Sequence, residues 1–548
     1  MILADINSGS RLHGGRTIFQ GLSWSLRLGE KIGLIGPSGC GKSTLLRLFA
    51  GVDQPDSGSV TTRKGTTVAY LPQEYAGTPG RSAIDELLAS RADLAAIDEA
   101  ILAAEHRMAD PNVVADPDAF DALILEHEHL LERFAAAGGP MLRNRAEALL
   151  RELGFAEADR ALPMEVLSGG QRKLIGIIRC MLADPDVLLL DEPDNHLDLE
   201  RKAALERLIR NFDGAVIVVS HDRYLLDETV ETIVELEPHR AEGVRLTRWE
   251  GNYTAYVAQK ELALVRQQQD FASQQKEIAR LEAAVARFKL WARIVVDERH
   301  IKQARNKQRQ IDRMEKVDRP VLERRRMSLR FRAGTRGGAK AVELRDVQKH
   351  FGDNVILRGA RATIMNGECI GIVGPNGAGK SVLLKLMLGS LEPDAGAVWV
   401  GPSIRLARYA QEHETLNFAQ TAVEALREVK PMLEAEAVSQ LGRFLLPYDA
   451  VRKPIATLSG GEKSRVQLAR LMFSDANCLL LDEPTNNLDI AAAEVLEDAL
   501  ERFTGTVVVV SHDRYLLDRL ADRIIEVRDG GLRIFEGGYS YYVEQTSR

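Results

Sequence analysis

Two glycine-rich segments of the chain each end in a lysine and a serine. Glycine lets backbone N–H groups wrap around an anion, the lysine can reach nucleotide phosphates, and the serine hydroxyl can hold Mg²⁺. Each segment follows an apolar strand pattern and precedes a helical one, as a phosphate loop requires. We therefore expect nucleotide phosphates to bind at Gly36, Pro37, Ser38, Gly39, Cys40, Gly41, Lys42 and Ser43, and at Gly374, Pro375, Asn376, Gly377, Ala378, Gly379, Lys380 and Ser381.

Acidic residues follow short apolar runs at two further places. Asp191 and Asp482 end such runs, where a carboxylate can steady the Mg²⁺ shell. The next residues, Glu192 and Glu483, are expected to act as general bases toward an attacking water. A surface ion pair at a strand end is the alternative for both glutamates, and the nearby phosphate-loop patterns favour the catalytic interpretation.

His221 and His512 each follow a β-rich apolar run and a serine. A lone histidine in such a place would usually be structural. Two histidines at equal offset after matching strands favour a contact with the γ-phosphate. We therefore include both with the catalytic candidates.

A second anion cradle is predicted where Ser and two Gly open a helix. It occurs twice, as Ser168, Gly169, Gly170 and Gln171, and as Ser459, Gly460, Gly461 and Glu462. Because each half of the chain already has its own phosphate loop, this cradle must serve another nucleotide.

The chain is an internal duplication. Ser168, Asp191 and His221 recur as Ser459, Asp482 and His512, each 291 positions later. Ser168 lies 95 positions after Gln73, whereas Ser459 lies only 48 positions after Gln411. The extra residues, about 91–143, have helical spacing and predict a projecting helical hairpin. Between positions 85 and 133 we count 13 acidic and 3 basic residues, so this arm is strongly acidic.

A basic helical segment joins the halves. Ile278, Leu281, Val285 and Phe288 recur at spacings of three and four, which is typical of a coiled-coil seam. After a break near 294–296, a second helix should carry Ile301, Ala304 and Ile311 on its packed side. Its other side should present a stripe of cations that binds RNA phosphates. Phe288 and Trp291, near the hairpin tip, have two interpretations: they stack on exposed bases, or they pack within the hairpin. The stripe consists of Lys302, Arg305, Arg309 and Arg313.

These segments together resemble the ATP-binding cassette (ABC) superfamily, whose cassettes pair head to tail. The resemblance implies an α/β fold with two P-loop nucleotide-binding domains in tandem, and ATP and Mg²⁺ as cofactors. It also implies two composite sites, each clamped between one phosphate loop and the other cassette's Ser-Gly-Gly. One joins Lys42, Ser43, Gln73, Asp191, Glu192 and His221 to Ser459, Gly460 and Gly461; the other joins Lys380, Ser381, Gln411, Asp482, Glu483 and His512 to Ser168, Gly169 and Gly170. The implied Mg²⁺ ligands are Ser43, Gln73, Asp191, Ser381, Gln411 and Asp482.

The whole chain looks like the ABC-F branch, whose soluble twin-cassette proteins act on the ribosome. The resemblance rests on the two cassettes, the single arm, the charged linker and the segments 250–253 and 304–307. It implies an ATPase that binds the ribosome when closed on ATP and leaves after hydrolysis. The linker would contact tRNA or rRNA, and the acidic arm a basic ribosomal protein. The expected domains are 1–255 with the arm at about 91–143, the linker at 256–331, and 332–548.

Four positions depart from the family pattern. Asp194 stands where the second cassette has Thr485, and its carboxylate is expected to slow the first site. Val382 replaces the α-phosphate-binding threonine that the first cassette has as Thr44. His13 occupies the position that matches Phe351 of the second cassette, the residue expected to stack on adenine. Glu462 of the second cassette occupies the position that matches Gln171 of the first. We expect both sites to bind ATP, with unequal turnover.

Two other functions compete with ribosome binding. A transporter ATPase subunit with separate permease chains would have no use for the linker and arm, and a DNA-repair ATPase would also use a basic rod. The four cysteines form no CxxC pair, which argues against a disulfide scaffold or a zinc site. No apolar run approaches the roughly 20 residues of a spanning helix. We expect a cytoplasmic monomer; housekeeping translation and antibiotic protection remain open.

Overall fold

The computed structural model describes residues 1–13, 16–109, 116–239, 243–294, 298–314, 338–410 and 414–546. Two compact units emerge from its internal contacts. The larger unit combines Met1–Arg248 with Arg326–Arg548, and the smaller unit is Trp249–Arg325. Within the larger unit we call the part before residue 249 the first cassette and the part from residue 338 the second cassette.

A six-stranded sheet forms the centre of the first cassette, with strand order β5-β6-β7-β3-β8-β9. Its strands β6 and β7 are buried along their whole length, and they read as continuous apolar runs because helices cover both faces. The strands and their helices are β3 (Lys31–Ile35), α1 (Lys42–Phe49), β5 (Val68–Leu71), α7 (Gly169–Leu182), β6 (Val187–Asp191), α8 (Leu199–Arg210), β7 (Ala215–Val219), α9 (Arg223–Thr229), β8 (Thr232–His239) and β9 (Gly243–Glu250).

The second cassette repeats this sheet in the order β14-β15-β16-β12-β17-β18. In both cassettes the first five strands in this order run parallel, so their carboxyl ends share one edge. The elements are β12 (Cys369–Val373), α12 (Lys380–Leu388), β14 (Leu406–Tyr409), α13 (Ala422–Val429), α14 (Glu434–Arg443), α15 (Tyr448–Val451), α16 (Gly460–Phe473), β15 (Cys478–Asp482), α17 (Ile490–Glu501), β16 (Thr506–Val510), α18 (Arg514–Leu520), β17 (Arg523–Arg528), β18 (Gly531–Phe535) and α19 (Tyr539–Thr546).

A three-stranded antiparallel sheet completes each cassette, with orders β2-β1-β4 and β11-β10-β13. Its apolar side chains share one core with the phosphate-loop helix and the parallel sheet, so α1 and α12 are held between two sheets. The strands are β1 (Ile2–His13), β2 (Arg16–Arg27), β4 (Ser57–Thr62), β10 (Lys340–Phe351), β11 (Asn354–Met365) and β13 (Ala395–Val400). The predicted α/β class with tandem nucleotide-binding domains is confirmed.

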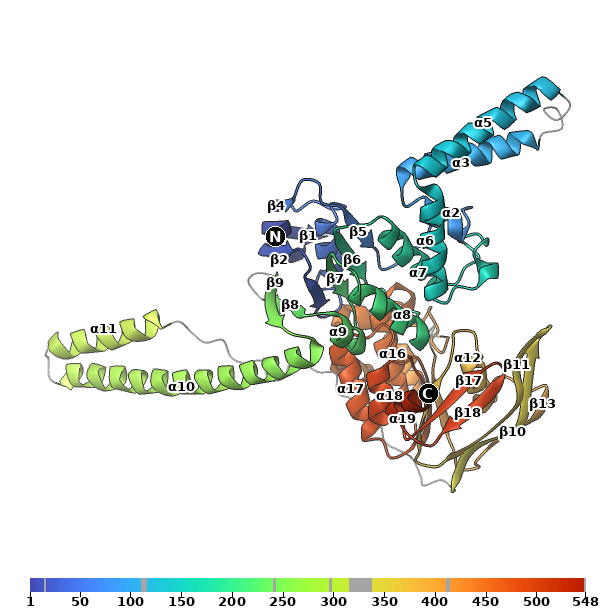
Figure 1. Cartoon of the computed structure of the whole chain (residues 1–548). Coiled ribbons are helices and arrows are strands. Elements are labelled where there is room, and N and C mark those ends of the chain that lie inside the picture. Colours follow the sequence, from blue (N-terminus) through green and yellow to red (C-terminus); the bar gives the residue numbers. More distant parts are fainter. Residues whose placement is uncertain are drawn as a thin grey trace. The chain divides into compact units, whose positions relative to one another are not determined.

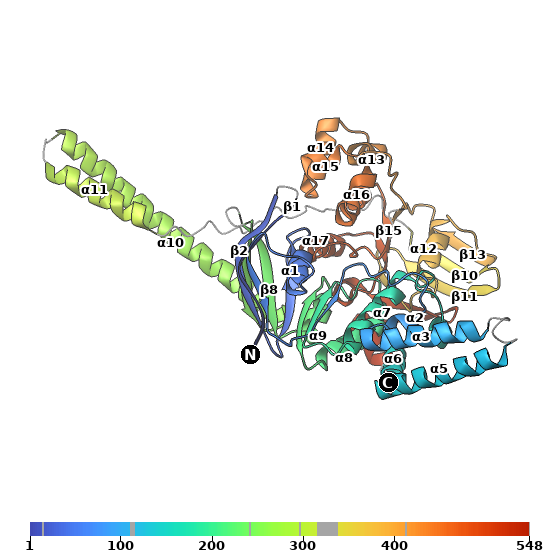
Figure 2. The same ribbon diagram turned by 90° about the horizontal axis from the view of Figure 1, so that it is seen from above.

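The inserted arm of the first cassette consists of helices (Figure 1). Helices α3 (Ala92–Met108) and α5 (Pro117–Ala136) run side by side in Figures 1 and 2, joined by ion pairs such as Arg107 to Glu126 at 3.2 Å. Helices α2 (Ala83–Leu88) and α6 (Gly139–Glu152) flank this pair in the sequence. Residues 110–115, between α3 and α5, lie outside the described residues, and Asp116 precedes the first residue of α5.

The smaller unit is a helical hairpin of α10 (Tyr253–Ile294) and α11 (Glu298–Arg313) (Figure 2). Asn252 starts α10, because its side chain accepts a hydrogen bond from the Ala255 N–H at 3.1 Å. Leu281 and Val285 of α10, with Ala304 and Ile311 of α11, are buried along the seam. Ile301, expected on the same face, is 44% exposed and lies in the first turn of α11.

Candidate nucleotide-binding and hydrolysis sites

The phosphate loops lie at the carboxyl ends of β3 and β12 and open α1 and α12. Gly41 and Gly379 are the N-cap residues, with φ of 102° and 99°, and no side chain caps either helix. A Cβ at Gly41 would meet Ile18 Cγ2 at 2.4 Å, so only glycine fits this left-handed turn. The first-turn N–H groups of both helices are thereby left for an anion. Lys42 and Lys380 lie over their loops, donating to the carbonyls of Gly36 at 2.7 Å and Gly374 at 2.8 Å.

Asp191 and Asp482 are the last residues of β6 and β15, and both are almost fully buried. Within the described residues, neither carboxylate oxygen of Asp191 has a hydrogen-bond partner, and nor does Oδ1 of Asp482. Burial raises the pKa of both carboxyls, while the Ser43 and Ser381 hydroxyls beside them lower it. Buried carboxylates with so few partners suit a hard cation that retains waters and phosphate ligands, so these residues fit Mg²⁺.

Glu192 lies in a hydrogen-bonded setting in the first cassette. Its Oε2 accepts from Gln73 Nε2 at 2.8 Å and from Asn195 Nδ2 at 2.6 Å, and its Oε1 lies 3.7 Å from His221 Nε2. Burial raises the pKa of Glu192, and the Asp191 and Asp194 carboxylates add to the rise. Burial also lowers the pKa of His221 to about 3, so its imidazole is neutral at pH 7. The predicted general base, the glutamine predicted to bind the metal and the histidine predicted to contact the γ-phosphate therefore lie together here.

Glu483 occupies the equivalent place in the second cassette. Its Oε2 accepts from the backbone N–H of His512 at 3.2 Å, and its Oε1 lies 3.5 Å from His512 Nε2. Burial raises the pKa of Glu483 to about 7, and burial lowers the pKa of His512. Gln411, the predicted counterpart of Gln73, lies outside the described residues.

The Ser-Gly-Gly segments open α7 and α16 as predicted helix starts. Ser168 accepts from the Gln171 N–H at 3.2 Å, and Gln171 Oε1 accepts from the Ser168 N–H at 2.9 Å, which is a capping box. Ser459 and Glu462 form the same box. Because Gln and Glu both provide the accepting oxygen, the box explains why Glu462 can replace Gln. Gly170 packs against the His196 carbonyl, where a Cβ would approach to 2.7 Å.

Each phosphate loop contacts the opposite cassette. The backbone N–H of Ser38 donates to Asp489 Oδ2 at 3.4 Å, and that of Asn376 donates to Asp198 Oδ2 at 3.2 Å. Ser38 and Asn376 are equivalent loop positions, and Asp198 and Asp489 cap α8 and α17. The two contacts are therefore reciprocal.

Comparisons with known proteins place this architecture. Models described as "ABC transporter" match residues 19–195 and 357–486, and a further model of the same description matches 240–331. "Energy-dependent translational throttle protein EttA" of Haemophilus influenzae is 36% identical, over 96% of this chain and 92% of its own length. "ABC transporter F family member 5" of Arabidopsis thaliana is 34% identical, over 99% and 78%. The chain belongs to the ABC-F subfamily.

Other matches agree with this assignment. "Putative ATP-binding protein YdiF" of Bacillus subtilis is 34% identical, over all of this chain and 83% of its own length. The solved structure of an archaeal ribosome recycling factor, aABCE1, in complex with stalk protein aP1 has a TM-score of 0.62 at 19% identity, covering 98% of this chain and 92% of its own, and supports the fold alone. Membership makes this ABC-F protein an ATP-binding ABC ATPase. Among its described helices, none has the length and apolar composition that crossing a membrane requires.

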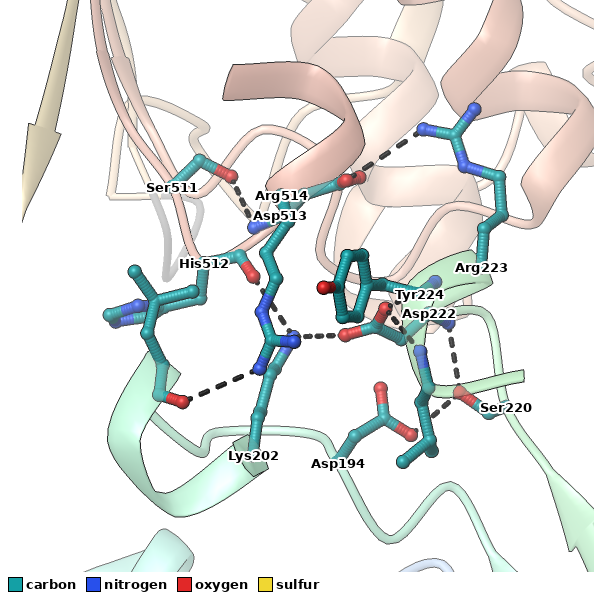
Figure 3. A network of polar contacts seen from close by, with 12 residues as sticks. Asp194, Lys202, Ser220, Asp222, Arg223, Tyr224, Ser511, His512, Asp513 and Arg514 are labelled. Carbon is teal, nitrogen blue, oxygen red and sulfur yellow. Dashed lines mark hydrogen bonds and ion pairs between the residues drawn. The ribbon is translucent and has the colours of Figure 1, made fainter. Parts of the chain in front are cut away.

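The interface of the two cassettes contains a second reciprocal set, which the sequence motifs did not indicate. Figure 3 labels three of its members, Arg223, Tyr224 and Arg514. Arg223 Nη1 donates to Glu497 Oε2 at 3.2 Å, and Arg514 pairs with Glu206 at 3.0 Å. The guanidinium carbons lie 4.7 Å from the Tyr515 ring centroid and 4.3 Å from that of Tyr224, respectively. The offset of 291 relates every pair, and the repeated segment after each histidine was the available signal.

The residue predicted to stack on adenine is exposed in this ABC-F protein, whereas the residue at the predicted α-phosphate position is partly buried. Phe351 is 52% exposed at the end of β10, with Lys349 Nζ 5.5 Å from its ring centroid. Val382, the third residue of α12, is partly buried and packs against the core, as its branched apolar side chain favours. The His13 side chain lies outside the described residues.

The basic stripe of the linker is accessible. Lys302, Arg305, Arg309 and Arg313 are all exposed on α11, opposite the buried Ala304 and Ile311. Phe288 is partly buried, with the Arg287 guanidinium carbon 5.8 Å from its ring centroid, while the Trp291 side chain lies outside the described residues.

Proposed function

We propose that this chain is a ribosome-associated ATPase of translation with two composite ATP sites. The observation that carries the paired sites is the reciprocal contact of each phosphate loop with the opposite cassette, Ser38 with Asp489 and Asn376 with Asp198. The role in translation is supported by the relative described as an energy-dependent translational throttle protein and by the exposed basic stripe of α11. The basic linker then has a use that a transporter ATPase subunit would not give it.

In each proposed site the chain binds phosphates through loop N–H groups and a lysine. Lys42 with Ser43 and Asp191 would hold Mg²⁺-ATP in the first site, and Lys380 with Ser381 and Asp482 in the second. Gln73 and Gln411 would complete the metal surroundings, and the Ser-Gly-Gly of the opposite cassette would close each site. When bound, Mg²⁺-ATP supplies a γ-phosphoryl group open to attack by water.

Glu192 and Glu483 would accept the proton of that water, and their raised pKa values suit proton transfer near neutral pH. The neutral histidines would orient toward the γ-phosphate, since imidazole can donate one hydrogen bond without a net charge. His221 Nε2 and His512 Nε2 lie within 4 Å of their glutamates, at 3.7 and 3.5 Å. Each pair can thus act on one water and one phosphate.

The linker would bind folded RNA through its phosphates. Four exposed cations along one helix face match the spacing of a phosphate backbone better than a base-specific contact, so affinity should fall steeply with salt. The acidic arm would avoid bare RNA and favour a basic ribosomal protein. We further propose a cytoplasmic protein that acts as a monomer by pairing its own two cassettes.

The test uses the Glu192→Gln/Glu483→Gln protein, because removing a general base slows hydrolysis by about 10²- to 10⁴-fold and should preserve the ATP-closed state. In sucrose sedimentation of cell lysate with ATP, we expect this variant to migrate with ribosomes and the wild type to remain near the top. Membrane enrichment would favour a transporter subunit instead.

A matched variant isolates the linker. Adding Lys302→Gln, Arg305→Gln, Arg309→Gln and Arg313→Gln should abolish ribosome migration while ATP binding is retained. Lys276→Gln with Arg280→Gln, exposed cations on α10, serves as the control for lost charge. Unchanged migration of the fourfold variant contradicts RNA binding through the stripe.

A further inference from the structure

One part of the cassette interface lacks the symmetry of the rest. The arginine–glutamate pairs, the tyrosines and the phosphate-loop contacts all occur twice at the cassette interface. Lys202 of α8 does not, because the position 291 residues later is Ala493. Asp194 is also unmatched, since Thr485 is its counterpart. Both departures fall in the first cassette.

Lys202 bridges the two cassettes from a buried position (Figure 3). Its Nζ donates to Asp222 Oδ2 at 2.8 Å in its own cassette, and to the backbone carbonyl of His512 at 3.2 Å in the other. Asp222 is itself held, because it accepts from the N–H groups of Tyr224 and Leu225 at the start of α9. Lys202 is therefore held by Asp222 of the first cassette and donates a hydrogen bond to the second.

Asp194 supplies a second negative charge to this buried cation. Its Oδ1 accepts from Ser220 Oγ at 2.7 Å, and the same hydroxyl accepts from the Asp222 N–H at 2.8 Å. Burial would lower the pKa of Lys202, but Asp222 and Asp194 outweigh it and raise the pKa above its ordinary value. Burial of a charge is stable only with such partners. The substitution at 194 is thus explained as a companion of Lys202.

The His512 peptide is held from both sides. Its N–H donates to Glu483 Oε2 within the second cassette, and its carbonyl accepts from Lys202 of the first. We propose that Lys202 is a positioning residue for the second ATP site, holding His512 from across the cassette interface. This inference rests on the proposed function, because it takes His512 to belong to that site. The methyl group of Ala493 cannot donate to His221, so the link runs in one direction only.

Single-site kinetics test this link. In the Glu192→Gln background only the second site turns over, and Lys202→Met should lower its kcat about tenfold with KM for ATP changed less than about twofold, as expected for lost positioning. In the Glu483→Gln background the same substitution should leave the first site within about twofold. Lys202→Arg, which keeps a buried donor, should recover much of the second-site rate.

A matched variant separates positioning from buried charge. Asp194→Thr/Lys202→Ala gives the first cassette the residues that the second already has at these two positions. Asp194 and its cation are removed together, and Asp222 keeps its backbone N–H partners at the start of α9. We expect it to melt near the wild-type temperature and still lose the second-site rate. An unaltered second-site rate in this variant overturns the proposal, as does equal slowing of both sites by Lys202→Met. Absence of ATP hydrolysis in both single-glutamate backgrounds overturns the proposed function itself.

Discussion

The two glutamate–histidine pairs occupy equivalent places and have different surroundings. Glu192 receives two side-chain amide hydrogen bonds and is 15% exposed, whereas Glu483 is 5% exposed and receives one backbone N–H among the described residues. The two glutamate–histidine distances, 3.7 and 3.5 Å, nevertheless differ little. Duplication of the sequence thus reproduced the distance between glutamate and histidine. The Asp194 carboxylate, which Thr485 replaces in the second cassette, adds to the raised pKa of Glu192.

The largest expected difference is in turnover. With Glu483→Gln only the first site hydrolyses ATP, and with Glu192→Gln only the second. We expect the first site to be the slower, because the Asp194 carboxylate, which Thr485 replaces in the second cassette, adds a negative charge near Glu192. Steady-state phosphate release at saturating ATP measures both rates. Equal residual rates would mean that the two surroundings are functionally equivalent.

Next in size is the effect on stability of the reciprocal ion pairs. Arg514→Ala leaves Glu206 buried without its cation, at a cost of about 3 kcal/mol in the free energy of unfolding. Arg223→Ala should cost less, since Glu497 keeps Arg519 at 3.4 Å. Chemical denaturation measures both, and Arg523→Ala, a partly buried arginine away from this network, is the comparison variant. A larger loss for Arg223→Ala contradicts this ranking.

The smallest expected effect is on how the stability of the nucleotide-free protein depends on pH. The folded-state pKa of Glu483, about 7, exceeds an unfolded value near 4.5, so the folded state binds more protons between these values and loses stability as the pH rises. Glu483→Gln removes this loss, and should stabilise the protein by about 2 kcal/mol at pH 8 and little at pH 5. Thermal unfolding at the two pH values tests this, with Glu192→Gln measured alongside. A gain for Glu483→Gln that is the same at both pH values contradicts it.

The sequence was sufficient to predict those parts of the candidate sites that depend on residues close together in the chain. The phosphate loops, the strand-ending Asp191 and Asp482, and the helix starts at Ser168 and Ser459 all lie on elements of the expected type. Local pattern can do this because glycine turns, helix caps and buried strands are determined by residues a few positions apart. The α/β class followed from the same signals.

The interface network could not be predicted in this way. Arg223 and Glu497 are 274 positions apart, and nothing in either segment indicates the other. Asp194 was expected only to slow the first site, because no local sequence pattern distinguishes its partner Lys202 from a solvent-exposed lysine on a helix. The comparison of residues 291 apart shows Lys202 as unmatched too, although not that its ammonium group contacts a carbonyl of the opposite cassette.

The length of α10 has a mechanical consequence. Its 42 residues, Tyr253–Ile294, extend about 63 Å at 1.5 Å per residue. A tilt of 10° about its first turn therefore sweeps its far end through about 11 Å, whereas atoms beside Tyr253 barely move. A displacement of less than one ångström near the start of this helix therefore becomes a displacement as large as a nucleotide at its far end.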